Sequence, residues 1–382
     1  MRIMISCGEA SGDLYAGALA DEIRRREPSV EFIGFGGPRL RAAGATLVGD
    51  YTQFSVTGLT EALRVIPRSF AMIRRLVSAA RTHRPDVFVA IDFPDFNFRL
   101  MSRLRRLGIP VVYYVSPQLW AWRPGRMKTM QRDVSRVLVI FPFEERLYRE
   151  AHVDVQFVGH PLVDLARSGV GREAFLQARG LNPGAPTVAL LPGSRRNEIE
   201  QTVPVIADAL PLIRSRVAGV QFTVACAPNL ADAHFQPFAA SPGVVLVREH
   251  TDDVIASADV AITASGTATV QCALHERPMV VVYRLSSMTY RLGKPFVKVN
   301  TYAMPNLVAG RTIVPELIQD HFTPARLADE TVSFLIDRKR YDETRTALRQ
   351  VRERLGSPGA SARAAAAVLD IAGHPVKGRP AA

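Results

Sequence analysis

Cysteine is scarce in this chain of 382 residues, which contains three: Cys7, Cys226 and Cys272. An odd number of widely spaced cysteines forms neither a disulfide framework nor a zinc signature, so we expect a reducing compartment. Long hydrophobic runs are lacking too. The longest, such as 137–143 and 279–283, fall short of the roughly 18 apolar residues of a membrane-spanning helix. The apolar run after Met1 is too short for a signal peptide, so we expect a cytosolic protein, soluble or peripheral.

Acidic residues are fewer than basic ones: 36 Asp and Glu against 48 Lys and Arg give a formal net charge of +12. This excess predicts an anionic partner, which could be nucleic acid, anionic lipid or a phosphorylated substrate. No motif of a nucleic-acid-binding fold accompanies the charge, so nucleic acid is disfavoured. The composition, 47% hydrophobic and 22% charged, is that of a globular protein and excludes disordered and collagen-like chains.

Short apolar runs alternate with amphipathic stretches in both halves of the chain. Such runs are typical of parallel strands buried on both faces, and their alternation with helices indicates βαβ units. The predicted strands are 2–7, 32–35, 87–91, 111–115, 137–141, 156–158, 187–191, 221–225, 244–247, 260–263 and 279–282. A linker rich in Gly and Pro occupies 161–186, and the stretch after Pro324 is helical. The sequence therefore predicts two doubly wound α/β domains whose cleft, at the carboxyl ends of both sheets, binds ligands.

The first predicted strand leads into Gly-Glu-Ala-Ser-Gly-Asp at 8–13, followed by a helix that Ser11 or Asp13 can cap. The N–H groups at this helix start favour an anion or a sugar hydroxyl, although an ordinary strand–turn–helix corner has the same pattern. Glu9 lies at the carboxyl end of the strand, where we expect its carboxylate to point into the cleft. A second glycine turn at 34–38 lacks the GxGxxG spacing of a dinucleotide-binding site.

A further carboxylate, Asp92, follows strand 87–91 and could remove a proton from a substrate hydroxyl within hydrogen-bond reach. Asp95 is interpreted as the N-cap of the next helix. One carboxylate pair without nearby His or Cys is a poor ligand set, so no dedicated metal is predicted.

Three features leave two interpretations open. Trp120 and Trp122 form either a platform for a sugar or an acyl chain, or a packed loop. The basic amphipathic stretch 57–84 either rests on anionic lipid or presents a solvated face. His160 is either a hinge or cleft residue or, as is commoner for a lone His, a structural group.

Two turns in the second half favour a nucleotide diphosphate. Pro-Gly-Ser-Arg at 192–195 follows strand 187–191, and Ala-Ser-Gly-Thr at 264–267 follows strand 260–263; each precedes a helix. A helix start next to a guanidinium suits a pyrophosphate, although capping serines and turn glycines are common. Two such turns in one domain make the nucleotide interpretation stronger than either turn does alone.

The order and spacing of these motifs resemble the lipid-A-disaccharide synthase family of GT-B glycosyltransferases, family 19. The resemblance spans about residues 3–320 and is carried by 8–13, 92–97, 114–123, 142–144, 159–161, 191–195, 264–267 and 305–307. It implies two Rossmann-like domains facing a central cleft: an acceptor domain at 1–165 and a UDP-sugar domain at 166–335. A helical tail at 336–382 is expected to pack back on the first domain.

The resemblance also implies a reaction. UDP-2,3-diacylglucosamine would condense with 2,3-diacylglucosamine 1-phosphate to give a β-1,6-linked disaccharide 1-phosphate and UDP, with inversion at the anomeric centre and no cofactor. The family works at the inner face of the inner membrane, so an anionic membrane surface is an expected partner and nucleic acid is not. Whether the chain forms a homo-oligomer stays open.

Roles for individual residues follow from the resemblance. The family's proposed base maps onto Asp92, and its other functional carboxylate maps onto Glu9. The implied donor site consists of Ser194, Arg195, Ser265, Gly266, Thr267, Gln271, Asn306 and Arg311. The implied acceptor and lipid contacts are Ser11, Trp120, Trp122, Arg64 and Arg68.

One position departs from the family pattern. Gln271 stands where the family usually has a Glu, as in other GT-B sites that hold a ribose. An amide oxygen accepts a hydrogen bond but lacks the charge that strengthens it, so we expect weaker donor affinity or a different donor. Two alternatives stay open. The first is a related GT-B enzyme that uses a non-acylated UDP-N-acetylglucosamine donor, such as an epimerase, although the basic amphipathic stretch argues against it. The second, prompted by Gln271, is a catalytically weakened homologue that binds lipid or a partner protein.

Overall fold

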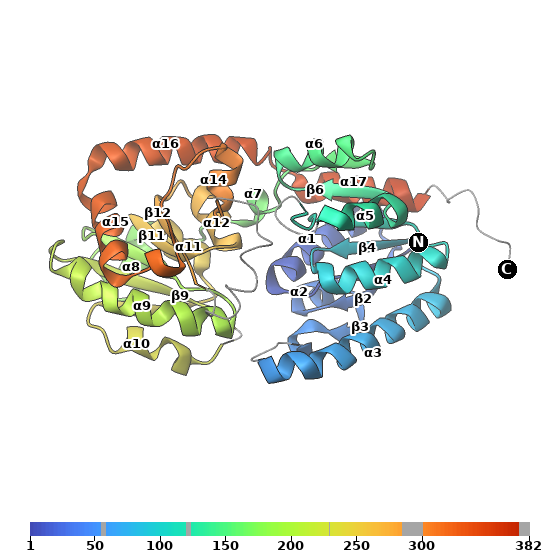
Figure 1. The fold of residues 1–382 in the computed structure, drawn as a ribbon, viewed down its shortest axis with the longest axis horizontal. Helices are drawn as coiled ribbons and strands as arrows, with labels where there is room; N and C mark the ends of the chain where they lie inside the picture. The colour runs from blue at the N-terminus through green and yellow to red at the C-terminus, as the bar shows by residue number, and fades with distance from the viewer. Residues whose placement is uncertain (55–58, 120–123, 229, 285–300, 374–382) are drawn as a thin grey trace. The chain divides into compact units, whose positions relative to one another are not determined.

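The computed structural model describes residues 1–54, 59–119, 124–228, 230–284 and 301–373, with side chains described outside 53–66. Contacts divide the chain into two compact units. Unit 1 consists of Met1–Pro161 and Leu355–Ala382, and unit 2 consists of Leu162–Arg354. Each unit contains one parallel sheet covered by helices (Figure 1), which confirms the predicted α/β fold. The three-part division at 165 and 335 stays a prediction.

Unit 1 contains a seven-stranded sheet in the order β3-β2-β1-β4-β5-β6-β7, in which every neighbouring pair is parallel. Its strands are β1 (Arg2–Ser6), β2 (Glu31–Gly36), β3 (Thr46–Asp50), β4 (Val87–Ile91), β5 (Val111–Tyr114), β6 (Arg136–Val139) and β7 (Val155–Phe157). Its helices are α1 (Ala10–Arg26), α2 (Pro38–Ala42), α3 (Leu59–His83), α4 (Pro94–Arg106), α5 (Met127–Asp133), α6 (Pro142–Glu150) and α17 (Ala360–Gly373), with short 3-10 turns at Tyr51–Phe54 and Pro124–Arg126.

Helices cover both faces of this sheet because its central strands are apolar on both sides. Every residue of β4 and β5 is buried, as expected for parallel strands inside a doubly wound sheet. The helices α3, α4 and α5 pack on one face, where Ile73, Leu100 and Met101 join Phe88 and Tyr113 in one core (Figure 1). The helices α1 and α17 pack on the other face.

The last helix, α17, is tied to unit 1 by polar contacts as well as by packing on α1. Arg363 donates to the carbonyl oxygens of Val158 at 2.8 Å, Ser357 at 2.7 Å and Pro358 at 2.8 Å. Near the end of the helix, Asp370 accepts from Arg136 on β6 at 2.8 Å. The chain therefore returns to unit 1 after completing unit 2.

Unit 2 contains a six-stranded parallel sheet in the order β10-β9-β8-β11-β12-β13. Its strands are β8 (Thr187–Leu191), β9 (Gln221–Cys226), β10 (Val244–Arg248), β11 (Val260–Ala264), β12 (Met279–Tyr283) and β13 (Glu316–Ile318). Its helices are α7 (Leu162–Leu165), α8 (Arg172–Gln177), α9 (Arg196–Arg214), α10 (Gln236–Ala239), α11 (Thr251–Ser257), α12 (Thr267–Leu274), α14 (Met304–Ala309), α15 (Pro324–Ile336) and α16 (Arg338–Arg354), with 3-10 turns at Asp232–Phe235 and Gln319–His321.

Both sheets reverse their strand order at the first strand. In unit 1 the chain proceeds outward from β1 to β3 and then resumes at β4 on the other side of β1; unit 2 repeats this around β8 and β11. Open α/β sheets bind ligands at such switch points, outside the carboxyl ends of the strands. The topology therefore predicts that ligands bind at the residues after β1 and β4, and at those after β8 and β11.

The structure differs from the sequence expectation in three places. The strands β3 and β13 were not expected, because β3 is a half-exposed edge strand and β13 has three residues. Asp95 does not cap α4: the helix begins at Pro94, with Phe93 at the N-cap position. Proline fits the first helical position because its missing N–H would be unpaired there.

Of the helices in the described residues, none combines the length and apolar character needed to cross a bilayer.

His160 lies inside unit 1, with 2% of its surface exposed. Its ring packs edge-on against Tyr15 and Phe141, at centroid distances of 6.0 Å and 5.3 Å. Burial lowers the pKa of His160 to about 3, because the charged imidazolium would lose its hydration. The folded protein therefore holds a neutral imidazole.

Replacing His160 with Phe should weaken the pH dependence of stability. In the unfolded chain an imidazole takes up a proton below about pH 6.5, whereas His160 in the folded chain stays neutral down to about pH 3. His160 should therefore lower the free energy of unfolding by about 1.4 kcal/mol for each pH unit that the pH drops through this window. Urea unfolding at pH 4, 5, 6 and 7 measures the slope.

We expect a shallower acid slope for His160→Phe than for wild type. The variant His83→Gln, which removes an exposed imidazole from the same unit, controls for the loss of a histidine as such. Equal slopes for His160→Phe and wild type would contradict the assignment of a buried neutral imidazole.

Candidate active site

Glu9 and Asp92 lie at the switch point of unit 1. β1 pairs with β4 in parallel, with Ser6 opposite Ala90, so the residues that follow these strands leave the sheet at the same edge. Glu9 comes three residues after Ser6 and is the N-cap residue of α1; Asp92 comes directly after β4. Both are partly exposed. The topology thus brings the two predicted carboxylates to one edge of the sheet.

The backbone is strained where Asp92 leaves the sheet. Asp92 and Phe93 have φ angles of 43° and 49°, and Val115, after the neighbouring β5, has a φ of 60°. A left-handed conformation costs a non-glycine residue about 1–2 kcal/mol and is least expected for a β-branched side chain. Strain of this kind is found at functional sites, where the surrounding structure enforces it.

Two buried side chains hold the Asp92 backbone in this conformation. The Asp92 carbonyl oxygen accepts from Nδ2 of Asn97 and from the hydroxyl of Tyr113, each at 2.8 Å. Asn97 and Tyr113 are both fully buried, so their positions are fixed by the core. Burial, followed by the nearby charge of Asp92, raises the pKa of the Tyr113 hydroxyl, which therefore stays protonated and able to donate.

The ring of Phe93 links Asp92 to the turn that carries Glu9. Phe93 stacks on Phe96 and Phe35, at centroid distances of 5.3 Å and 6.3 Å. A Cβ atom at Gly8 would lie 2.3 Å from this ring, so only glycine fits there. Gly8 precedes Glu9 and Phe93 follows Asp92, so this contact fixes the two carboxylate-bearing segments against each other.

Asp13 caps a different helix from the one expected. Helix α1 begins at Ala10 after Glu9 and has no side-chain cap, so neither Ser11 nor Asp13 caps it. The Asp13 carboxylate is 1% exposed and accepts from the backbone N–H groups of Gly37, Arg39 and Leu40 at 2.8–3.1 Å. Asp13 thereby satisfies the first turn of α2, which belongs to the second glycine turn.

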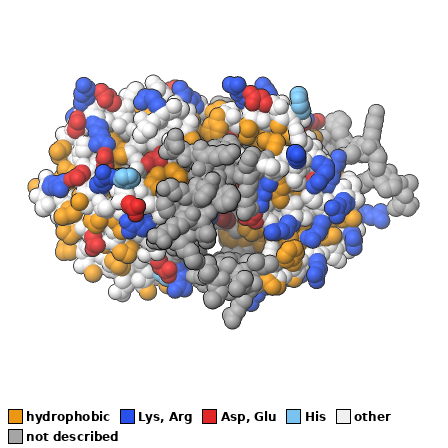
Figure 2. All heavy atoms as spheres, in the orientation of Figure 1, with side chains coloured by type: hydrophobic (Ala, Val, Ile, Leu, Met, Phe, Trp, Pro, Cys, Tyr) orange, Lys and Arg blue, Asp and Glu red, His pale blue; other side chains and the backbone are white. Residues whose placement is uncertain are grey.

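The predicted acceptor and lipid contacts are only partly described. Ser11 lies half-buried in the first turn of α1, and Arg68 is exposed on α3. Trp120, Trp122 and the side chain of Arg64 lie outside the described residues. Lys and Arg side chains gather over the part of unit 1 formed by α3 and α4 (Figure 2). The exposed arginines of this region are Arg68, Arg74, Arg75, Arg81 and Arg84.

In unit 2, Ser194 and Arg195 form the turn between β8 and α9. Glu198, in the first turn of α9, accepts from the backbone N–H of Ser194 at 3.2 Å and of Arg195 at 3.4 Å. Its other carboxylate oxygen accepts from Nη1 of Arg195 at 3.3 Å. Gly193 has a φ of 129°, and a Cβ there would lie 2.9 Å from the Glu198 carboxylate. The turn thus presents backbone N–H groups and a guanidinium together, with an internal carboxylate as their partner.

The second turn of unit 2 lies beside the first. β8 and β11 are paired with Leu191 opposite Thr263, and a Cβ at Gly193 would lie 3.8 Å from that of Ala264. Gly266 and Thr267 are exposed, with Gly266 at the N-cap position of α12. Ser265 donates to the carbonyl oxygen of Tyr302 at 3.1 Å. The structure therefore brings Ser194, Arg195, Ser265, Gly266 and Thr267 to one edge of the sheet.

Two aromatic residues accompany these turns. Tyr283, at the end of β12, stacks on Tyr302 at a centroid distance of 6.0 Å. Burial raises the pKa of Tyr283, with a further rise from the charge of Glu198, so its hydroxyl stays protonated. The sequence analysis missed both tyrosines; the position of Tyr283 at a strand end was the available signal.

Gln271 lies one helical turn beyond Thr267 on α12. Its Nε2 donates to both carboxylate oxygens of Asp252, each at 3.2 Å. Asp252 belongs to α11 and also contacts Nε2 of His275 at 2.9 Å. Sequence reasoning missed both residues. Asp252 comes close to Gln271 only through the packing of α11 on α12. The four-residue spacing from Gln271 was the available signal for His275.

Asn306 is buried, and its amide is fully engaged. Its Nδ2 donates to the Val314 carbonyl at 2.9 Å and to Glu316 at 2.7 Å. Its Oδ1 accepts from the N–H groups of Ile313 at 2.7 Å and Val314 at 3.0 Å. These four bonds use the two donors and two acceptor sites of an amide. Asn306 thus positions the segment before β13, and its predicted direct contact with the donor stays a prediction.

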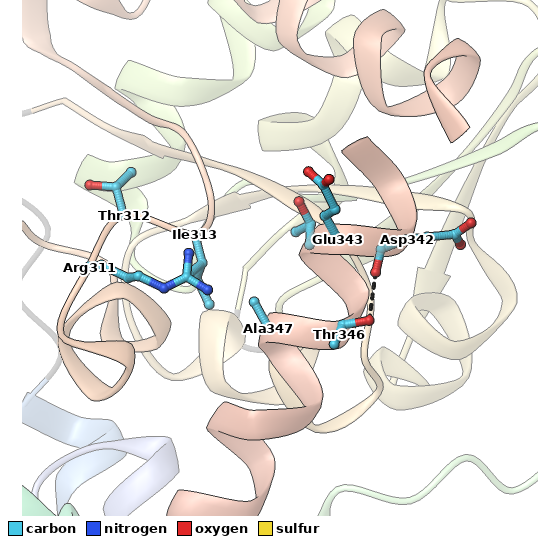
Figure 3. A pocket seen from close by; sticks show the side chains of 8 residues that line it. Arg311, Thr312, Ile313, Asp342, Glu343, Thr346 and Ala347 are labelled. Carbon is cyan, nitrogen blue, oxygen red and sulfur yellow. Dashed lines mark hydrogen bonds between the residues drawn. The ribbon is translucent and has the colours of Figure 1, made fainter. Parts of the chain in front are cut away.

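Arg311 is exposed and lines a pocket of about 600 Å³ within unit 2. Ile313 and Thr312 border one side, and Asp342, Glu343 and Thr346 of α16 border the other (Figure 3). Of the residues that line this pocket, Arg311 is the one that the sequence analysis assigned to the donor site. The residues of the turns after β8 and β11 do not line this pocket.

Comparison with known proteins agrees with the motif analysis. The chain is 44% identical over 377 residues to a lipid-A-disaccharide synthase of Geobacter metallireducens, covering 97% of both chains. It is 43% identical to that of Geobacter sulfurreducens, covering 98% of both.

Solved structures agree with the fold. The UDP-GlcNAc 2-epimerase of Neisseria meningitidis aligns with a TM-score of 0.70 at 12% identity, over 97% of this chain and all of that one. A calicheamicin glycosyltransferase aligns with a TM-score of 0.63 at 18% identity, over 98% of this chain and 99% of that one, so the fold is GT-B. The model of one family, described as lipid-A-disaccharide synthetase, matches residues 3–371. By its motifs and by these similarities, the chain belongs to the lipid-A-disaccharide synthetase family of glycosyltransferases.

Proposed function

We propose that this protein condenses UDP-2,3-diacylglucosamine with 2,3-diacylglucosamine 1-phosphate, forming the β-1,6-linked disaccharide 1-phosphate and UDP. The observation that carries the proposal is the pair of switch points: one presents the carboxylates Glu9 and Asp92, and the other presents N–H groups and Arg195. A glycosyl transfer needs both sets. A carboxylate activates the acceptor hydroxyl, and a cationic, N–H-rich turn stabilises the leaving diphosphate.

Asp92 is the general base in this proposal. Its carboxylate takes the proton of the acceptor 6-hydroxyl while that oxygen attacks the anomeric carbon of the donor. The bond from the anomeric carbon to the phosphate oxygen breaks, and its electron pair leaves with UDP. Attack opposite to the leaving group inverts the anomeric centre. The hydrogen bonds from Asn97 and Tyr113 support this role because they fix the Asp92 backbone before substrate binds.

The turns of unit 2 bind the donor diphosphate. Arg195, the turn at Ser194 and the start of α12 at Gly266 and Thr267 would stabilise the charge that develops on UDP. Ser265 and Asn306 act by holding the neighbouring segments, through Tyr302 and the residues before β13. In unit 1, Glu9 and Ser11 would orient the sugar by hydrogen bonding.

The basic face of α3 is proposed to contact the anionic surface of the inner membrane. Phe70 is 38% exposed beside these arginines, and the guanidinium of Arg99 lies 5.5 Å from its ring centroid. An exposed aromatic side chain among arginines suits a lipid headgroup region, where each basic residue contributes about 1 kcal/mol. In this proposal Arg64, Arg68 and the Trp120 and Trp122 loop contact the acyl chains and headgroups.

The direct test of the proposal uses purified protein and the two acylated monosaccharides. We expect a disaccharide 1-phosphate and one equivalent of UDP, detected by mass spectrometry. A matched reaction replaces the donor with UDP-N-acetylglucosamine and should give neither product. Conversion of that non-acylated donor, without reaction of the acylated pair, would favour the epimerase alternative.

Replacing Asp92 with Asn should remove the general base without weakening the binding of UDP. We expect turnover to fall by about 10²–10⁴-fold, the usual contribution of a general base. UDP affinity should change little, because the proposed donor residues belong to unit 2. Asp95→Asn removes an exposed carboxylate three residues away and should keep wild-type turnover. Turnover of Asp92→Asn at the wild-type rate would refute the assignment.

Tyr113→Phe should loosen the Asp92 backbone while leaving the carboxylate in place. Losing this hydrogen bond should lower kcat about five- to tenfold and leave KM for both substrates nearly unchanged. Tyr148→Phe removes another buried hydroxyl of unit 1, which bonds Ser116 at 2.6 Å, and controls for general loss of stability. If both variants lose kcat in proportion to stability, Tyr113 has no positioning role.

Vesicle binding tests the membrane surface. Arg74→Glu with Arg75→Glu should weaken binding to vesicles containing phosphatidylglycerol by about tenfold or more, because two favourable charges become repulsive. Phosphatidylcholine vesicles should bind neither form. Arg25→Glu with Arg26→Glu applies the same charge change to exposed positions at the end of α1 and should bind like wild type. Equal losses from the two pairs would show a general charge effect instead.

A further inference from the structure

Gln271 forms a polar cluster with Asp252 and His275 next to the proposed diphosphate site, and the chemistry above assigns no role to Asp252 or His275. The Asp252 carboxylate connects the two other side chains, with Gln271 Nε2 at 3.2 Å and His275 Nε2 at 2.9 Å. The Asp252 side chain is 22% exposed and the His275 side chain is 13% exposed, so solvent reaches the cluster.

The cluster extends along one face of α12 from the proposed diphosphate site. Thr267, Gln271 and His275 are spaced four residues apart, which places them on the same side of the helix. Gln271 lies about 6 Å along the axis from Thr267. A nucleoside diphosphate whose phosphates lie at the start of α12 would thus bring its ribose close to Gln271.

The hydrogen-bonding capacity of the cluster matches a pair of hydroxyl groups. Gln271 uses its Nε2 on Asp252, which leaves its Oε1 as an acceptor. A carboxylate accepts at about four positions, and the contacts with Gln271 and His275 use three of them. Two adjacent acceptors, one of them charged, fit the two donors of a vicinal diol.

The ionic partners of Asp252 also bear on its capacity to bind a diol. Among the described residues, no Lys or Arg forms an ion pair with Asp252; its partner is His275, which is charged only when protonated. Hydrogen bonds to an ionised acceptor are roughly twice as strong as neutral ones. The charge that Gln271 lacks is thus present one hydrogen bond away.

We propose that Asp252 and Gln271 together bind the ribose hydroxyls of the uridine diphosphate donor, with Asp252 supplying the carboxylate. This inference rests on the proposed function, because it assigns the part of that donor site that binds the ribose. It also reverses the expectation that Gln271 weakens donor binding. His275 contacts the same carboxylate through its Nε2 and is a positioning residue.

Titration calorimetry with three nucleotides tests the proposal on the full-length protein. The probes are UDP, 2′-deoxy-UDP and 3′-deoxy-UDP. Wild type should bind UDP about tenfold or more tightly than at least one deoxy analogue, since a charged acceptor loses its donor. Asp252→Asn should weaken UDP binding to the level of that analogue while the analogue itself binds as before.

A second pair of variants tests whether Asp252 contacts the ligand or only joins α11 to α12. Gln271→Glu places a carboxylate beside Asp252, and two adjacent carboxylates resist ionising together, so UDP affinity should not improve. Asp252→Asn combined with Gln271→Glu moves the single carboxylate to position 271 and should restore the preference for UDP over the deoxy analogue. Asp329→Asn removes an exposed carboxylate from α15 in the same unit and should bind all three probes like wild type.

The outcomes distinguish this inference from the proposed function. If wild type binds UDP and Asp252→Asn keeps the full preference for UDP over both deoxy analogues, the ribose assignment is wrong and the proposed function stands. If Asp252→Asn lowers the melting temperature and weakens all three probes equally, Asp252 only joins α11 to α12 and the assignment is again wrong. If wild type binds none of the probes, both proposals are overturned.

Discussion

The pairing of two parallel strands at the reversal point of each sheet is the constraint on which this structure depends. In unit 1 the pair is β1 and β4; in unit 2 it is β8 and β11. Because the strands on either side lead away in opposite directions, the segments after these two strands have room to leave the sheet together. The candidate carboxylates of unit 1 and the two turns of unit 2 lie at these edges, and Gln271 lies one helical turn away from one of them.

Rigidity at these edges comes from buried polar side chains, which a uniformly apolar core could not supply. Asp13 ties the start of α2 to α1, and Asn306 ties the segment before β13 to α14. Asn97 and Tyr113 hold a carbonyl oxygen in a conformation that the chain would otherwise avoid. The hydrogen bonds of Asp13 and Tyr113 reach backbone atoms more than 20 positions away, so these contacts exist only in the folded state.

The sequence was sufficient for the features that depend on local pattern. The bounds of β4 and β8 match the predicted strands at 87–91 and 187–191, because a short apolar run between two helical stretches is typical of a buried parallel strand. Motif order was sufficient for the family. The edge strand β3 escaped notice because its exposed side removes the apolar run on which the prediction depends.

The features that sequence could not supply depend on long-range packing. Asp252 meets Gln271 across 19 positions, and Asn97 meets the Ser6 carbonyl at 3.4 Å across 91. Local signals also gave a wrong prediction for Asp95. Aspartate is common at N-caps, yet α4 begins at Pro94 and Asp95 pairs with Arg126. Asp13 suits a cap of its own helix, yet its carboxylate reaches another.

The return of α17 to unit 1 has a consequence for synthesis of the chain. Unit 2 is continuous and can complete its contacts once residue 354 is available, whereas the side of α1 that packs on α17 has no cover until residues 360–373 emerge. Domains generally form in order as the ribosome releases them. Unit 1 is therefore the first to begin and the last to be completed. During synthesis, the nascent chain exposes the apolar surface of α1 until α17 packs on it.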